Sequence, residues 1–143
     1  MIGDCCIRHY SKTQTTVSLS SGEAELHGIA QGAANALGVQ ALLLDMGWQL
    51  KCNVHSDATT AIGICRRKGL GKVRHLDCTD LWIQESARAG RFAIHKVEGA
   101  KNPADILTKY LDRATMELHL KTLGMRKMLG RPACAPAATG VTK

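Results

Sequence analysis

Residues 11–26 read SKTQTTVSLSSGEAEL and lead from a polar loop into a long helical pattern. Ser20 can act as the N-cap of this helix, and Glu23, three residues later, completes a capping box. Helical spacing of apolar residues continues to about residue 46, where Gly47 provides a C-terminal stop. The apolar stripe predicted to face the core contains Leu26, Ile29, Ala30, Ala33, Leu37, Ala41 and Leu44.

Short segments with strand and helix patterns follow this helix. Residues 51–55 alternate in polarity and predict a strand that ends at Ser56 and Asp57. A helix over 58–67 comes next, and the order strand, acidic residue, helix is typical of an α/β unit. We also predict strands over 5–10 and 91–97, a helix over 76–89 that is stopped by Gly90, and a loop over 99–102. A helix is predicted to begin at Pro103 with Asn102 as its N-cap, and a final helix to run from Asp112 to about residue 129.

Three carboxylates stand at positions where acidic residues often form sites. Glu25 lies near the start of the long helix, Asp57 follows a strand, and Asp105 opens a later helix. Open α/β sheets build their sites at the carboxyl ends of strands, and gathered carboxylates repel unless they hold a cation such as Mg²⁺. The alternative is structural, since the helix dipole favours an acid in the first turn. That alternative explains Glu23 and could also cover Glu25 and Asp105.

Composition limits the class of protein. The chain has 143 residues, 45% apolar and 3% aromatic, which predicts one domain with an aliphatic core and excludes collagen-like, mucin-like or fully disordered chains. Nineteen Lys and Arg residues against twelve Asp and Glu give a formal net charge of +7. This balance favours a polyanionic partner, either nucleic acid or an acidic membrane surface. No apolar run approaches the ~18 residues of a membrane span.

The cysteines and the two ends of the chain carry further expectations. Six cysteines without a C-x-x-C pair argue against a zinc ribbon and favour reduced, mostly buried thiols in an intracellular protein. The N-terminus lacks the basic and apolar regions of a signal peptide. Residues 130–143 are rich in Ala, Pro, Gly and Thr, so we predict a disordered tail after a domain over residues 1–129.

Four segments together resemble one protein family, the ribonuclease H domains of Ty1/copia-type retrotransposons. Residues 11–26 resemble the family segment SKKQ-x-x-V-x-LSS-x-EAE. Residues 56–62, SDATTAI, resemble D-N-x-x-A-I, and residues 74–77, RHLD, resemble KHID. Residues 102–109, NPADILTK, contain the segment ADILTK. The resemblance covers about residues 7–112, and the four segments occur in the order of the family.

The resemblance implies a fold, an activity and a place in a larger protein. The fold is α/β and RNase H-like, with a mixed sheet flanked by helices. The implied activity is two-metal hydrolysis of the RNA strand in RNA–DNA hybrids, with two Mg²⁺ ions that Mn²⁺ can replace. Glu25, Asp57 and Asp105 match the family's catalytic and metal-binding carboxylates. The reverse transcriptase part of the same Pol polyprotein is an implied partner, without membrane association, in a cytoplasmic particle or the nucleus.

The first catalytic Asp of the family has no match in this chain. In the family it lies on the first strand, whereas residues 1–10 align best with the third strand and the turn before it. The chain is therefore predicted to lack the first two strands, and Asp4 falls in the turn. We expect a fragment of a larger polyprotein, a degraded element or an incomplete gene; alternatively, another chain supplies the missing strands. Two other functions stay open, a catalytically dead nucleic-acid-binding remnant and an integrase-like nuclease of the same fold.

Basic residues are candidates for contacts with the phosphate backbone of the nucleic acid. Phosphates are recognised by such charges with salt-sensitive affinity, although a solvated loop is an equal alternative. The scattered aromatic residues provide no stacking platform for single strands. The candidates are Arg66, Arg67, Lys68, Lys72, Arg74 and Lys101.

Overall fold

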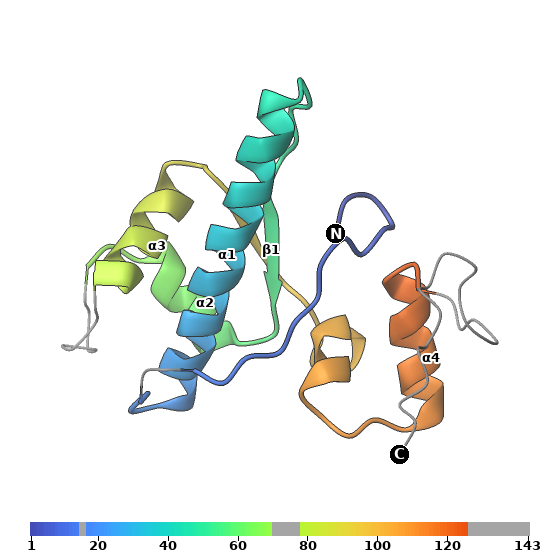
Figure 1. Cartoon of the computed structure of the whole chain (residues 1–143). Helices are drawn as coiled ribbons and strands as arrows, with labels where there is room; N and C mark the ends of the chain where they lie inside the picture. Colours follow the sequence, from blue (N-terminus) through green and yellow to red (C-terminus); the bar gives the residue numbers. More distant parts are fainter. Residues whose placement is uncertain (15–16, 70–77, 126–143) are drawn as a thin grey trace, which may run out of the picture. The chain divides into compact units, whose positions relative to one another are not determined.

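The computed structural model describes residues 1–14, 17–69 and 78–125 (Figure 1). The chain folds into two compact units, one formed by Lys12–Asn102 and the other by Met1–Ser11 with Pro103–Lys143. The predicted tail over 130–143 lies outside the described residues. A single domain over residues 1–129 stays a prediction.

Local capping determines both ends of helix α1 (Ser21–Asp45). The Ser20 hydroxyl accepts a hydrogen bond from the Glu23 backbone N–H at 3.2 Å, and the Glu23 carboxylate accepts one from the Leu19 N–H at 2.8 Å. At the other end Gly47 has a φ of +85°. The Trp48 N–H then reaches the carbonyl of Leu43, which gives a Schellman motif. The predicted cap and stop of this helix are confirmed.

The buried stripe of α1 is shorter than predicted. Leu26, Ile29, Ala30, Ala33 and Leu37 are buried, as expected. Ala41 and Leu44 are exposed, so their assignment to the core was wrong. Figure 1 shows the reason, because the last turns of α1 extend past helices α2 (Thr59–Arg66) and α3 (Cys78–Arg88), which cover its first turns.

The sheet of this unit has two parallel strands, β1 (Asn53–Ser56) and β2 (Ala93–Lys96). Val54 lies opposite Ile94 and faces the helices, which contact one face of the sheet. On the other face His55 lies opposite His95, with ring centroids 5.3 Å apart. From α1 to β2 the helices and strands follow one another in the predicted order, while the larger mixed sheet of an RNase H-like fold stays a prediction.

The hydrophobic core joins α1, α2, α3 and β2. It consists mainly of aliphatic side chains, as the composition predicts. Phe92 is the one aromatic member among the described residues. Gly90, with a φ of +70°, ends α3 as predicted and turns the chain toward β2. The buried hydrophobic set is Leu26, Ile29, Ala30, Ala33, Leu37, Ala61, Ile62, Ile64, Cys65, Ile83, Phe92 and Ile94.

Four cysteines lie in the described part of the chain, and they are free thiols: Cys5, Cys6, Cys52 and Cys65. Burial raises the pKa of the Cys52 thiol above its usual value. A raised pKa lowers the thiolate fraction, so this side chain is a poor nucleophile. Cys65 is buried in the core and Cys52 packs against it, whereas Cys5 is exposed and Cys6 is half-buried. The expectation of mostly buried thiols therefore holds for only part of this set.

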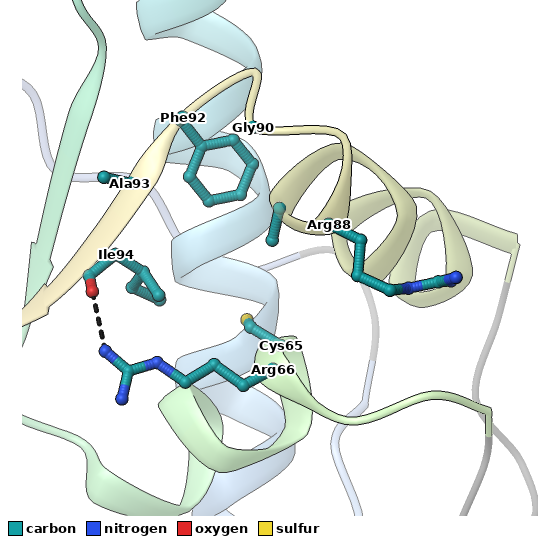
Figure 2. Close-up of a pocket in the computed structure, with 8 residues that line it drawn as sticks. Cys65, Arg66, Arg88, Gly90, Phe92, Ala93 and Ile94 are labelled. Carbon is teal, nitrogen blue, oxygen red and sulfur yellow. Dashed lines mark hydrogen bonds between the residues drawn. The ribbon is translucent and has the colours of Figure 1, made fainter.

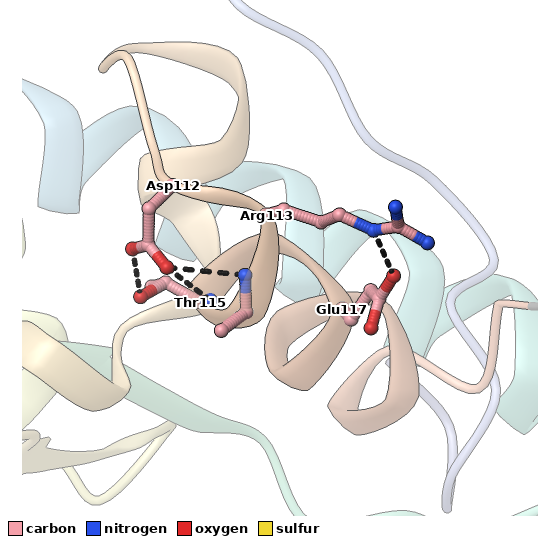
Figure 3. Close-up of polar contacts among 5 residues, drawn as sticks. Asp112, Arg113, Thr115 and Glu117 are labelled. Atoms are coloured by element: carbon pink, nitrogen blue, oxygen red, sulfur yellow. Dashed lines mark hydrogen bonds and ion pairs between the residues drawn. The ribbon is translucent and has the colours of Figure 1, made fainter.

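The other unit contains the 3-10 helix η2 (Pro103–Leu107) and helix α4 (Arg113–Thr122). Figure 3 shows the Asp112 carboxylate at the start of α4, where it accepts hydrogen bonds from the N–H groups of Ala114 and Thr115. Its bonds to Thr115, foremost that from the hydroxyl, hold the pKa of Asp112 below the usual value. Arg113 and Glu117 pair one turn apart at 2.9 Å. The predicted cap at Asp112 is confirmed.

The strand predicted near the N-terminus was wrong. Residues 5–10 form no strand, since the Cys6 N–H bonds to the Leu123 carbonyl after α4 and only an isolated bridge joins Ile2 to Cys5. The helix predicted to begin at Pro103 is present as η2, and it carries Asp105. Asn102, the predicted N-cap, lies directly before η2. It ends the 3-10 helix η1 (Gly99–Lys101), which occupies most of the expected loop, and its N–H bonds to the Gly99 carbonyl.

The capping box of α1 makes a measurable contribution to stability. Replacing Ser20 by Ala removes the side-chain acceptor for the Glu23 N–H, so we expect the free energy of unfolding to fall by ~1 kcal/mol. Urea denaturation followed by circular dichroism measures this change. Ser21→Ala, at the exposed next position, is the control and should shift stability by less than ~0.5 kcal/mol. Equal effects of the two variants would contradict the cap.

Candidate functional site

Asp57 lies directly after β1 and two residues before α2. Its carboxylate is half-buried, and within the part of the chain that the structure describes it has no hydrogen-bond or ion-pair partner. Gly99 flanks it, since a Cβ at that glycine would lie 3.5 Å from the Asp57 Oδ2. A partly desolvated carboxylate without a partner favours a cation or a hydrogen-bond donor from outside.

Glu25 reaches the same end of this unit through a close approach of two helices. A Cβ at Gly22 in the first turn of α1 would lie 2.9 Å from the Thr60 Cγ2 in the first turn of α2. The starts of both helices therefore meet, and Asp57 precedes one of them while Glu25 lies one turn into the other. Glu25 is exposed and has no partner among the described residues.

Glu23 has a different environment from Glu25, although only one residue separates them. Its side chain is 6% exposed and accepts the Leu19 N–H in the capping box. A carboxylate committed to the helix N-terminus is less available to a metal ion. This geometry is consistent with the preference for Glu25 over Glu23, which the sequence motif implies.

Asp105 belongs to the other compact unit, on η2. Its carboxylate is 14% exposed and pairs with the Lys109 ammonium at 2.9 Å. Lys109 lies one turn later, and its backbone N–H also bonds to the Asp105 carbonyl. The segment ADILTK, residues 104–109, is thus held together by a local ion pair and a turn of helix.

The carboxylates offer the donor type that Mg²⁺ prefers. Mg²⁺ is commonly held by one or two protein carboxylates, with waters and substrate phosphates completing its shell. Asp57 and Glu25 fit this requirement, because both are unpartnered in the described structure and both lie at one end of their unit. Over residues 1–14, 17–69 and 78–125, no three His, Cys, Asp or Glu side chains gather as a metal site.

The predicted basic residues fall into three groups. Arg66, at the end of α2, donates to the Ile94 carbonyl at 2.9 Å, and Arg67 and Lys68 follow it. Lys101 is exposed and pairs with Glu98 at 2.8 Å, a contact that raises the pKa of the lysine. Lys72, Arg74 and the segment RHLD lie outside the described residues.

Gln84 holds the backbone at Gly69, which follows the basic residues Arg66, Arg67 and Lys68. Gln84 was missed by the sequence analysis. It is 1% exposed on α3. Its Oε1 accepts the Gly69 N–H at 3.0 Å, and its Nε2 donates to the carbonyls of Ile64 and Gly69 at 3.1 Å each. A polar residue on the apolar face of a helix was the available signal, but its partners lie 15 and 20 residues away.

Removing the Gln84 amide should destabilise this unit. Gln84→Met keeps the length of the side chain and leaves the Gly69 N–H without its acceptor, so we expect a loss of ~1–3 kcal/mol in the free energy of unfolding. Urea denaturation provides the measurement. Gln31→Met, at an exposed position on α1, is the matched control. A Gln84 variant as stable as this control would refute the anchoring role.

Most of this chain is similar to part of a retrotransposon polyprotein. It is 29% identical over 117 residues to the retrovirus-related Pol polyprotein from transposon TNT 1-94 of Nicotiana tabacum. The match covers 80% of this chain and about 9% of the length of that relative. No family model and no solved structure matches the chain. No helix in the described ranges combines the length and hydropathy needed to cross a membrane. The chain is thus homologous to part of a retrotransposon Pol polyprotein.

Proposed function

We propose that this chain is the ribonuclease H-like region of a copia-type retrotransposon Pol polyprotein and that it hydrolyses the RNA strand of RNA–DNA hybrids. The observation that carries the proposal is the half-buried, unpartnered Asp57 at the carboxyl end of a parallel strand, with Glu25 at the same end of the unit. Sites of open α/β sheets occur at such strand ends.

Asp57 and Glu25 would together hold one Mg²⁺ ion. The family resemblance assigns Asp105 a role at a second ion. Bound Mg²⁺ supplies Lewis-acid chemistry for phosphodiester hydrolysis, and Mn²⁺ can substitute. To join a metal site, Asp105 must exchange its ion pair with Lys109 for the cation. The carboxylates bind and orient the metal, whereas the chain's basic residues neutralise the phosphates of the hybrid.

The nucleic acid would be bound through its backbone. Arg66, Arg67 and Lys68 cluster at the end of α2, and Lys72, Arg74 and Lys101 extend the set in sequence. An enzyme that cuts any hybrid must read helix shape and 2′-hydroxyl groups rather than bases. The reverse transcriptase of the same polyprotein would supply hybrids as the products of its synthesis.

A second candidate is nucleic-acid binding without cleavage. The observation that favours it is the formal net charge of +7, because an excess of basic residues supports binding to phosphates without any metal site. In this case the basic residues retain their role, and the carboxylates serve only the fold. Both candidates bind the hybrid, so only the chemical step separates them.

An assay with an end-labelled RNA–DNA hybrid tests the proposed function. We expect cutting of the RNA strand with Mg²⁺ or Mn²⁺ and none with EDTA, and the DNA strand should stay intact. A folded protein that binds the hybrid but never cuts it, with either metal, would overturn the nuclease and support the second candidate. An RNA–RNA duplex of the same sequence is the substrate control.

A further inference from the structure

A cavity of about 410 Å³ opens between the ends of α2 and α3 and the strand β2. Figure 2 shows Arg66 and Arg88 on two sides of it, with Phe92, just before β2, and Ile94, in β2, on the remaining side. The two apolar side chains are 3% and 8% exposed. The buried Phe92 ring offers no face for a base to stack on. The charged residues at the edge of the cavity, its rim, are the surface available to a ligand.

Arg66 is held in position at this rim. One of its terminal nitrogens donates to the Ile94 carbonyl at 2.9 Å, as the dashed line in Figure 2 marks. A guanidinium carries five N–H donors in a rigid fork. One is thus used to orient the group, and the remaining donors can bind an anion without a large loss of side-chain freedom.

Arg88 lines the cavity at the end of α3, and Arg91 stands in the chain between two other lining residues, Gly90 and Phe92. Both arginines are exposed, and neither has an ion-pair partner in the described part of the chain. The Arg91 backbone N–H bonds to the Ser86 carbonyl at 3.1 Å, which fixes this residue relative to the helix. Glu85 is the acidic neighbour on α3, one turn before Arg88, and it forms no ion pair with it.

We propose that Arg66, Arg88 and Arg91 form a phosphate-binding rim for the sugar–phosphate backbone of the bound hybrid. This inference rests on the proposed function and adds two residues and a location to it. Guanidinium groups match phosphate oxygens through paired hydrogen bonds, which favours a phosphodiester backbone as the ligand. Figure 2 shows the Arg66 and Arg88 guanidinium groups pointing apart, so they contact separate phosphates.

The rim also lies at a useful distance from the candidate carboxylates. Asp57 precedes α2 and Arg66 ends it, and the eight residues of this helix span ~12 Å at 1.5 Å per residue. Consecutive phosphates of one strand advance by ~3.4 Å along the duplex axis. A strand that crosses Asp57 therefore reaches the rim about three to four nucleotides away from the site of cleavage.

The salt dependence of hybrid binding tests this rim. Fluorescence anisotropy in EDTA, where no cutting occurs, gives the slope of log Kd against log salt for the wild type and for the double variant Arg88→Gln/Arg91→Gln. We expect weaker binding for all hybrid sequences and a slope smaller by about 2, one for each lost contact. The conservative double variant Arg88→Lys/Arg91→Lys should restore most of the slope and part of the affinity, since it keeps the charge without the fork.

The control is Lys51→Gln/Arg113→Gln, which removes two positive charges at exposed positions elsewhere. Equal effects of both double variants would show that binding depends only on the net charge of the protein, which would refute the proposed rim. If poly-glutamate competes for binding as strongly as unlabelled hybrid, the rim binds acidic peptides as well as it binds hybrid, which would also refute the proposal. Cleavage is measured separately. If the wild type cuts the hybrid but the Arg88/Arg91 variant shows an unchanged slope, the proposed rim is wrong and the proposed nuclease is not. If the variant shows a reduced slope but the wild type does not cut, the proposed nuclease is wrong and the rim is not.

Discussion

Replacing Asp57 by Asn should abolish cleavage of the RNA strand while leaving the protein folded. The amide keeps the shape of the side chain and removes the negative charge that would bind Mg²⁺. Losing a group that merely supports a metal ligand already costs ~10–100-fold in activity or affinity. For a direct ligand we therefore expect a loss of more than ~100-fold, measured as the initial rate of cutting of an end-labelled hybrid.

Matched variants separate this effect from a general loss of acidic charge. Asp45→Asn changes an exposed carboxylate at the last residue of α1, and it should retain full activity. Glu25→Gln should behave like Asp57→Asn, whereas Glu85→Gln on α3 should not. An Asp57 variant that cuts as fast as the wild type would remove this residue from the proposed site.

Truncating Leu26 should have the largest effect on stability. This side chain is fully buried in the core, on the α1 turn that follows the capping box. Leu→Ala at a fully buried position removes apolar contacts and leaves a cavity, at a cost of ~2–5 kcal/mol. A domain with a typical stability of ~5–15 kcal/mol loses much of its margin in this way. Urea denaturation gives the free energy of unfolding of each variant.

The same helix provides the control for this variant. Leu42 is 60% exposed on the part of α1 that runs past the core. Leu42→Ala makes the same chemical change without a cavity, so the expected loss is under ~0.5 kcal/mol. Similar losses in the two variants would contradict the burial of Leu26 and the assignment of the core.

The sequence predicted the features that depend on neighbouring residues. Ser20 with Glu23, Asp112 and the glycines after α1 and α3 mark helix ends through hydrogen bonds over a few residues. It failed where a distant partner decides the conformation. Residues 5–10 have a pattern compatible with a strand, but the Cys6 N–H is taken by the Leu123 carbonyl, more than one hundred residues away.

The sequence by itself determined most helix ends, the order of helices and strands from α1 to β2, and the four segments that resemble retrotransposon ribonuclease H domains. These depend on residue types at short spacing. The tertiary structure decided which residues meet. It brought the starts of α1 and α2 together at Gly22 and Thr60, and it placed Gln84 against Ile64 and Gly69. It also gathered Arg66 and Arg88 around one cavity. Such contacts depend on how the helices pack, because the facing side chains come from segments far apart in the chain.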